Sequence, residues 1–225
     1  MPAMIISVAH RKGGIGKTSI TLHLATALAT KKGYKVAVLD TDSQQSAFKY
    51  REFESRNYNG QEPPYVVERV LPKHLFDEIR YLREKYDVIF IDVPRLTEDK
   101  DDSQLSTALT YCDGVLIPIV AGELEGLSSI EFVKLIQGIE KYKKEKDFSF
   151  IYYGFLNKKN QRKENATAVK FMKKLGVPMF QSSLSDVKVL SKPYTYESVM
   201  ESKEGRVRFA PFFKEFLTKY ELDHG

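Results

Sequence analysis

The sequence has one cysteine, Cys112, and it lacks any long apolar run. A single thiol cannot form an internal disulfide, which excludes the disulfide-stapled class and makes a reducing, cytoplasmic setting the expected one. No apolar stretch approaches the roughly 18 residues that a membrane-spanning helix requires. Residues 1–11 contain neither a charged leader nor a cleavage site, so they do not indicate a secretory signal.

The amino-acid composition is that of an ordinary globular protein. Of 225 residues, 42% are hydrophobic and 29% are charged, which is enough for a core with a solvated surface. Collagen-like and disordered classes are therefore excluded. Because the chain shows no internal repeat and no low-complexity linker, we expect one domain over residues 1–225.

The positive charge is concentrated in the last third of the chain. The net charge is +5, yet residues 157–214 contain 13 basic and 5 acidic side chains, leaving 22 basic and 25 acidic ones elsewhere. A basic third on a slightly acidic body suggests a surface for a polyanion, either nucleic acid or anionic lipid. Charge alone does not separate this reading from a solvated surface rich in lysine.

Short apolar runs alternate with amphipathic segments along the whole chain. Most of the runs are continuous, which is typical of parallel strands that are buried on both faces. The alternation predicts an α/β fold with a doubly wound, mostly parallel sheet flanked by helices. Strands are expected at 4–9, 35–40, 88–92, 114–119, 148–156 and 177–180, and helices at 17–30, 45–56, 72–85, 103–111, 127–144 and 165–175.

A final helix is indicated by aromatic and apolar residues at the spacing of one helical face. We expect this face to pack on the sheet. Its members are Phe209, Phe212, Phe213, Phe216, Leu217 and Tyr220.

The strongest motif lies directly after the first predicted strand, where residues 8–19 read VAHRKGGIGKTS. Its glycines, Gly13, Gly14 and Gly16, allow successive backbone N–H groups to converge on phosphate oxygens. Lys17 suits the β- and γ-phosphates, the Thr18 hydroxyl suits magnesium, and the start of the following helix adds partial positive charge. This pattern predicts a phosphate-binding loop (P-loop).

The loop resembles the deviant Walker A motif of the ParA/MinD group of ATPases, because a second lysine, Lys12, stands at its head. Residues 39–46, LDTDSQQS, resemble the second acidic motif of that group, and residues 88–94, VIFIDVP, resemble its Walker B strand. Residues 108–118 also follow the family pattern. Ser43 and Arg95 stand where the family has proline.

The resemblance implies a P-loop NTPase of the deviant Walker A type that uses ATP and Mg²⁺. Lys17 would hold the β- and γ-phosphates, and Lys12 would reach the nucleotide of a partner subunit. Asp42 would orient the attacking water next to magnesium. The implied sets are Lys12, Lys17 and Asp42 for catalysis; Lys12, Gly13, Gly14, Ile15, Gly16, Lys17, Thr18 and Ser19 for the nucleotide; and Thr18, Asp40, Asp42 and Asp92 for the metal, with Asp40 and Asp92 in its outer shell. An aspartate that ends a buried strand can also simply cap the next turn, a reading that stays open for all three aspartates.

Residues 157–160, NKKN, follow a predicted strand and resemble the guanine-reading motif of GTPases without its final aspartate. The Asn157 amide can donate and accept, which matches adenine, whereas guanine asks for a carboxylate. Asn157 is therefore a candidate for base binding. A surface turn is the alternative.

The resemblance is strongest to small partition ATPases without an N-terminal helix-turn-helix. It implies an ATP-dependent homodimer, nonspecific binding to double-stranded DNA, a ParB-like partner that stimulates a weak hydrolysis, and a cytoplasmic, nucleoid-associated location. Phosphate contacts of this kind carry no sequence information. The candidates for DNA contact are Lys188, Lys192, Lys203, Arg206 and Arg208, and solvated side chains are the alternative for each.

Other functions share this type of fold. A MinD-like ATPase that acts on a membrane or protein scaffold would present a basic amphipathic helix at the C-terminus. The acidic Glu215, Glu221 and Asp223 argue against membrane binding there. The nitrogenase iron protein needs two cysteines per subunit, so Cys112 alone excludes that relative. A ligase would need a substrate pocket, and no motif indicates one.

Overall fold

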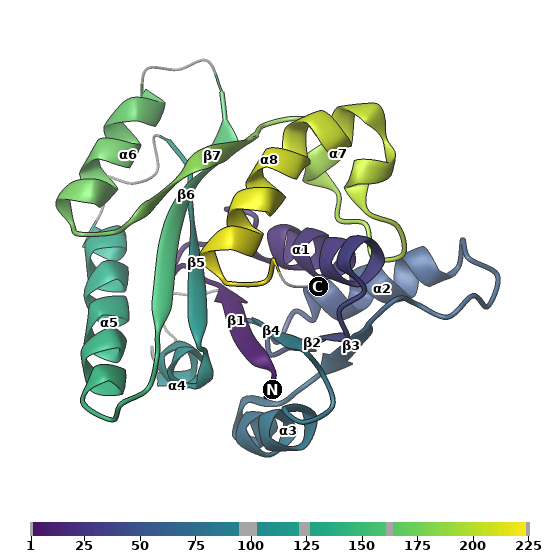
Figure 1. Ribbon diagram of the computed structural model, residues 1–225, viewed down its shortest axis with the longest axis horizontal. Coiled ribbons are helices and arrows are strands. Elements are labelled where there is room, and N and C mark those ends of the chain that lie inside the picture. Colours follow the sequence, from purple (N-terminus) through teal and green to yellow (C-terminus); the bar gives the residue numbers. More distant parts are fainter. Residues whose placement is uncertain (1, 95–102, 122–126, 161–163, 224–225) are drawn as a thin grey trace.

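The computed structural model describes residues 2–94, 103–121, 127–160 and 164–223 (Figure 1). Within them, seven strands form one sheet in the order β3-β2-β4-β1-β5-β6-β7, and every neighbouring pair is parallel. The predicted α/β class is therefore confirmed. The strands are β1 (Met4–Val8), β2 (Val36–Asp40), β3 (Val66–Arg69), β4 (Val88–Asp92), β5 (Gly114–Ile119), β6 (Ile151–Lys159) and β7 (Met179–Ser185).

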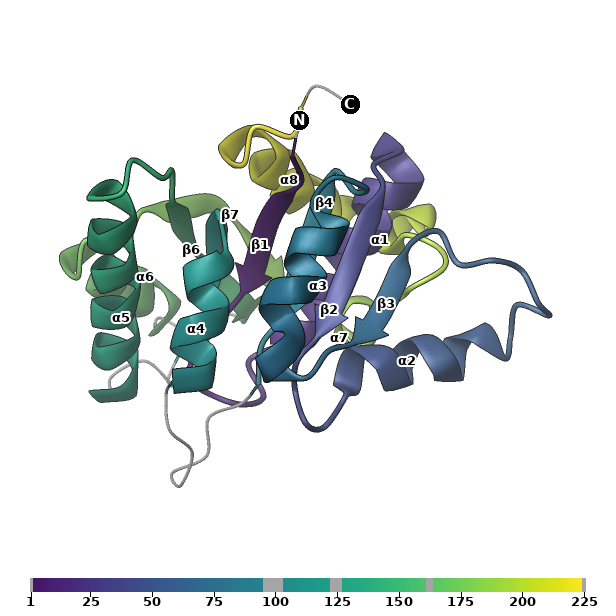
Figure 2. The ribbon, with the colours of Figure 1, turned by 90° about the horizontal axis from the view of Figure 1, so that it is seen from below.

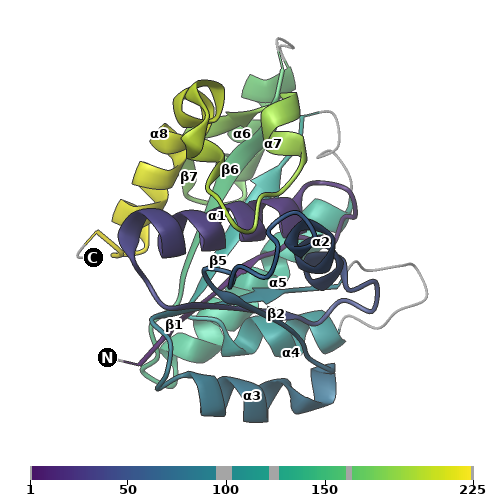
Figure 3. The ribbon, with the colours of Figure 1, turned by 90° about the vertical axis from the view of Figure 1, so that its right-hand side faces the viewer.

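Helices cover both faces of the sheet, as Figure 3 shows in a side view. The elements α1 (Lys17–Lys32), α2 (Ser46–Ser55), α7 (Lys188–Ser191) and α8 (Lys203–Lys219) lie on one face. The other face carries α3 (Leu75–Leu82), α4 (Ser103–Tyr111), α5 (Leu127–Lys144) and α6 (Glu164–Lys174), most of which are in the foreground of Figure 2. Two 3₁₀ turns, η1 (Pro72–His74) and η2 (Val199–Glu201), precede α3 and α8.

The core consists of two apolar layers separated by the sheet. In β1, Ile6 and Val8 point into the α1/α8 layer, whereas Ile5 points into the α3–α6 layer. β2, β4 and β5 are buried along their whole length. Burial on both faces explains why these strands read as continuous apolar runs.

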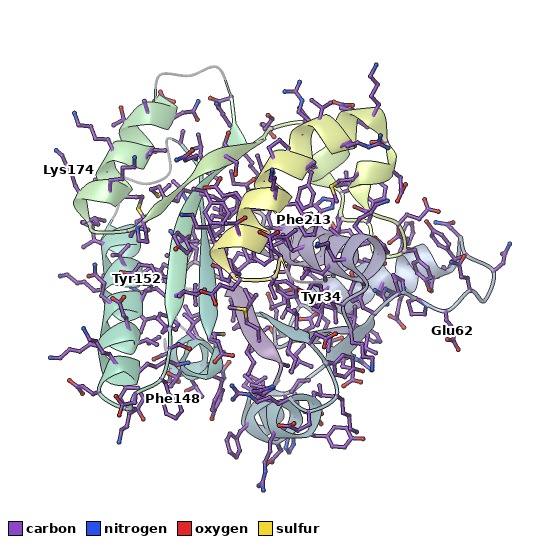
Figure 4. All side chains as sticks on the ribbon, viewed as in Figure 1. Tyr34, Glu62, Phe148, Tyr152, Lys174 and Phe213 are labelled. Atoms are coloured by element: carbon purple, nitrogen blue, oxygen red, sulfur yellow. The ribbon has the colours of Figure 1, made fainter. Side chains whose placement is uncertain are left out.

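The aromatic face of α8 packs on the sheet as expected. Phe209, Phe212 and Phe216 are fully buried, and Figure 4 shows Phe213 between α8 and the elements below it. The opposite side of α8 has a second role at the edge of the sheet. The Glu215 carboxylate accepts hydrogen bonds from the backbone N–H groups of Gln181 (2.8 Å) and Ser182 (2.7 Å) in the edge strand β7.

Several predicted boundaries were wrong. The strand expected at 148–156 begins only at Ile151, because Asp147 is a left-handed turn residue and Phe148 is 66% exposed. β3 and α7 were missed: β3 has four residues and includes two charged ones, and α7 is a single turn. Arg95 and most of the acidic stretch at 98–103, which reads EDKDDS, lie outside the described residues. No helix in the described part of the chain combines the length and apolar character needed to cross a bilayer.

One glycine allows α8 to begin where it does. A Cβ on Gly205 would lie 1.9 Å from the Val199 carbonyl oxygen, whereas a Cβ on Gly138, in α5, would meet nothing within 4 Å. We expect Gly205→Ala to lower the free energy of unfolding by about 1–3 kcal/mol through overpacking. Gly138→Ala, the matched control, should raise it by up to about 1 kcal/mol. Urea unfolding followed by circular dichroism measures both, and equal effects would contradict the proposed close contact.

Candidate nucleotide-binding site

The loop between β1 and α1 leaves the start of α1 open to a ligand. Gly14 (φ 76°) and Gly16 (φ 93°) adopt the left-handed conformation, which glycine enters at little cost. Gly16 is the N-cap of α1 and has no side chain to occupy the first N–H groups of the helix. Those donors, with the positive end of the helix dipole, suit an anion.

The loop is held by side chains from distant parts of the sequence. Asn157, at the end of β6, is buried and donates its amide Nδ2 to the carbonyl of Ile15 (2.7 Å). Lys158 donates from Nζ to the carbonyl of Gly14 (2.8 Å). The Asn157 amide also fills the space beside Gly16, where a Cβ would lie 2.7 Å from its nitrogen. The surface-turn alternative is therefore wrong for Asn157.

His10 supports the first residues of the loop, and no motif in the sequence indicated this role. Its Nδ1 accepts the backbone N–H of Lys12 (3.0 Å), and its ring packs against Phe132 on α5. Burial, reinforced by the positive charges of Lys17 and Lys12, lowers the pKa of His10 to about 4. The imidazole is therefore neutral at pH 7 and available as an acceptor. Arg11 adds an ion pair with Glu131.

Lys17 spans the loop. Its Nζ donates to the carbonyl of Lys12 (2.8 Å), so the buried ammonium lies inside the curve of the loop. A cavity of about 180 Å³ opens beside it. Of the predicted residues, Gly14, Gly16, Lys17, Thr18, Ser19 and Asp42 line this cavity; Ser46, Tyr50 and Val93 join them without having been predicted.

The carboxylates lie at the ends of neighbouring strands. Parallel pairing of β2 with β4 places Asp40 opposite Asp92. Burial raises the pKa of Asp92 to about 7, and the negative charge of Asp40 adds to this rise. The Thr18 hydroxyl donates to Asp92 (2.9 Å to Oδ2), which favours the ionised form. Thr18 and Asp92, predicted from separate motifs, are thus brought into contact.

Asp40 and Asp42 differ in what their carboxylates do. Both oxygens of Asp40 accept backbone N–H groups, from Asp42 (3.1 Å) and Phe48 (3.1 Å), so Asp40 caps the turn into α2. Asp42 accepts from the backbone N–H of Gln44 (2.9 Å) and borders the cavity beside Lys17. Asp40 therefore makes the capping bonds of the alternative reading, and its place in the outer metal shell stays a prediction. Asp42 borders the space that a ligand would occupy.

These oxygen donors fit a magnesium ion that is shared with phosphates. Among the described residues, no three His, Cys, Asp or Glu side chains are grouped so as to hold a metal. Mg²⁺ prefers hard oxygen ligands and usually takes only one or two from the protein, with the rest from phosphates and water. The Thr18 hydroxyl and the Asp92 carboxylate beside it are of this type.

A second cavity, of about 270 Å³, lies on the other side of the loop. It is bounded by Asn157 and Ser19 on one side and by the segment from β7 into α7 on the other. The residues of that segment in the lining are Ser185, Asp186, Val187, Leu190 and Ser191. No motif marks them, because their position depends on how β7 and α7 fold back over the loop.

The five basic residues predicted for DNA contact are all exposed and lie in or between α7 and the first turns of α8. Arg206 also donates from Nε to the carbonyl of Met200 (3.2 Å). α7 and α8 contact each other and are adjacent in Figure 1. The two helices that carry or border these residues therefore lie side by side.

The parallel sheet and the loop at the start of α1 define a P-loop nucleotide-binding protein. Residues 6–199 match the model of the CobQ/CobB/MinD/ParA nucleotide binding domain, and the chain belongs to that family.

Individual relatives are more distant. The maintenance of carboxysome distribution protein A of Halothiobacillus neapolitanus is 24% identical over 183 residues, which cover 81% of this chain and 79% of that protein. A protein of Borrelia burgdorferi B31 assigned to plasmid partition, solved with AMPPNP, superposes with a TM-score of 0.69 at 20% identity over 97% of this chain and 100% of that one. Cobyrinic acid a,c-diamide synthase of Mycobacterium smegmatis, solved with an ATP analogue and magnesium, superposes with a TM-score of 0.71 at 15% identity. The superposition covers 96% of this chain and 94% of that one.

We expect Lys17→Ala to weaken ATP binding by at least about 100-fold, because a charge-assisted contact to phosphate is lost. Titration with a fluorescent ATP analogue in the presence of Mg²⁺ measures this. Lys144→Ala, at the exposed far end of α5, is the control and should bind as the unchanged protein does. Retained affinity in Lys17→Ala would contradict the phosphate-binding assignment.

Proposed function

We propose that this protein is an ATP-hydrolysing switch of the ParA type that positions a cargo on nonspecific DNA. The observation that carries the proposal is the loop with two lysines, Lys12 and Lys17, beside the pair of Thr18 and Asp92. The named relatives support it, since one maintains carboxysome distribution and another is assigned to plasmid partition. The domain expected over residues 1–225 would carry this switch.

In this proposal the nucleotide is ATP. Its phosphates occupy the cavity beside Lys17, and its base occupies the cavity between Asn157 and α7. The AMPPNP and ATP-analogue complexes of the two solved relatives support an adenine nucleotide. Because the Asn157 Nδ2 already donates to the loop, its contribution to base binding is to hold the wall of this cavity.

Hydrolysis would proceed by attack of water on the γ-phosphorus and cleavage of the bond to the bridging oxygen. Magnesium, when bound, neutralises phosphate charge. Lys17 binds the β- and γ-phosphates, and Asp42, at the border of the same cavity, orients the water. Lys12, at the head of the loop, reaches the nucleotide of a second copy, so homodimer formation depends on bound ATP.

The output of the switch would be DNA binding in the cytoplasm, on the nucleoid. The exposed basic residues of α7 and α8 supply phosphate contacts, and α7 also contributes Leu190 and Ser191 to the lining of the base cavity. A ParB-like partner on the cargo would stimulate hydrolysis and release. The carboxysome relative favours a protein assembly as a second candidate for the cargo. The buried aromatic face of α8 gives no support to membrane binding.

The roles of Asp42 and Lys12 are separable by substitution. We expect Asp42→Ala to bind ATP and dimerise, with hydrolysis reduced by about 100-fold or more, because the attacking water is no longer oriented. Lys12→Ala should bind ATP but neither dimerise nor hydrolyse it. Size-exclusion chromatography with light scattering and a phosphate-release assay distinguish the two. Normal turnover in Asp42→Ala would assign water orientation to another group.

DNA binding is tested by titrating random-sequence duplex DNA with ATP–Mg²⁺, with ADP and without nucleotide, at two salt concentrations. Binding should require ATP and weaken steeply with salt. Replacing Lys203, Arg206 and Arg208 together by alanine should lower the affinity for DNA by at least about 10-fold and make that affinity less sensitive to salt. The control removes an equal charge from the end of α5, at Lys141, Lys144 and Lys146, and should bind normally. Equal losses of DNA affinity in the two triple variants would mean that only the net charge of the protein matters. If the unchanged protein does not bind DNA under any of these conditions, the DNA function is refuted.

A further inference from the structure

Residues 187–201 form a strap that leaves β7, crosses α1 and reaches α8. In Figure 3 its yellow-green trace passes α1 next to α2. Side chains of α1 bind it at three points: His23 Nε2 contacts the Leu190 carbonyl (3.3 Å), Thr26 donates to the Tyr194 carbonyl (2.6 Å), and Lys31 pairs with Glu201. The strap is therefore fixed by polar bonds as well as by apolar packing.

The strongest attachment of the strap comes from Arg51 on α2. This arginine is only 7% exposed, although a buried guanidinium is costly unless its donors are satisfied. It donates from Nε to the Thr195 hydroxyl (3.0 Å), from one terminal nitrogen to the Thr195 carbonyl (3.2 Å) and from the other to the Tyr65 carbonyl (2.6 Å). Its guanidinium also lies 4.3 Å from the centre of the Tyr65 ring.

Glu54, one helical turn further along α2, completes the attachment. Its Oε2 accepts both the backbone N–H and the hydroxyl of Thr195, each at 2.6 Å. The Thr195 hydroxyl thus donates to Glu54 and accepts from Arg51, bridging two opposite charges. Every polar group of this fully buried threonine is bonded to α2.

The two sides of this attachment are connected along the chain to the two cavities of the nucleotide site. Tyr50, the residue before Arg51, lines the phosphate cavity. On the strap, Val187, Leu190 and Ser191 line the cavity on the other side of the loop, opposite Asn157. A movement of Thr195 away from α2 would pull on the strap that forms this wall.

We propose that Arg51 and Glu54 are positioning residues for the base of the bound nucleotide. They hold Thr195 and, through it, keep the α7 end of the strap against the base cavity. The inference rests on the proposed binding of ATP. It predicts that the attachment contributes to affinity for a ligand with a base and contributes little for a ligand that consists of phosphates alone.

The experiment compares dissociation constants for ATP and for inorganic tripolyphosphate, both with Mg²⁺. Thr195→Val keeps the shape of the side chain and removes the bridging hydroxyl, while Arg51→Met removes the guanidinium. For each variant we expect the ATP constant to rise about tenfold and the tripolyphosphate constant to change less than about twofold. Backbone amides of residues 187–191 should also exchange hydrogen faster in Thr195→Val.

Lys143→Met is the matched control, because Lys143 is also buried and donates to a backbone carbonyl, that of Cys112. It should lose thermal stability and leave both constants unchanged. The positioning role would be overturned if a variant lost equal affinity for ATP and for tripolyphosphate, or if a folded Thr195→Val protein lost no affinity for ATP. In both cases the proposed binding of ATP would stand. Failure of the unchanged protein to bind ATP would instead overturn the proposed function, and the positioning role with it.

Discussion

The parallel pairing of β2 with β4 is the constraint on which the nucleotide site depends. It places Asp40 beside Asp92 at the carboxyl ends of the two strands, and β1 on the other side of β4 delivers the loop to the same edge. The chain runs outward from β1 to β2 and β3, returns to insert β4 between β2 and β1, and then crosses β1 to build the other half of the sheet. This reversal of direction opens a crevice at the carboxyl ends of the strands. The cost of burying two carboxylates there is visible in the raised pKa of Asp92. A cation shared with phosphates would relieve that cost.

The loop itself is organised by contacts that approach it from several directions. His10 holds its beginning, Asn157 holds the carbonyl before Gly16, and Lys17 spans the space between. Each of these bonds uses a backbone group of the loop, so the conformation does not rely on the loop's own residues alone. A loop that is fixed before its ligand arrives loses less conformational entropy on binding.

Much of this arrangement could be predicted from the sequence, and the failures have common physical causes. The strands that are buried on both faces read as continuous apolar runs, and the strands expected at 88–92 and 114–119 agree with β4 and β5 to the residue. β3 was missed because an edge strand needs fewer apolar residues. The loop glycines, Lys17, Thr18 and Asp92 stand in short local patterns. In contrast, no local pattern encodes the bond by which Asn157 supports the loop, because its partner Ile15 is 142 positions away. The same holds for Arg51 and Thr195, which are 144 positions apart.

The bond between Glu215 and the edge of β7 limits how copies of this protein can associate. An uncovered strand edge invites the strand of another molecule, and proteins that gather at high density on one support are exposed to that hazard. Here the carboxylate of α8 occupies two consecutive backbone donors of the edge strand. A continuous sheet through several copies would require α8 to release them. Pairing with another strand at this edge would therefore cost the bonds that Glu215 makes to β7.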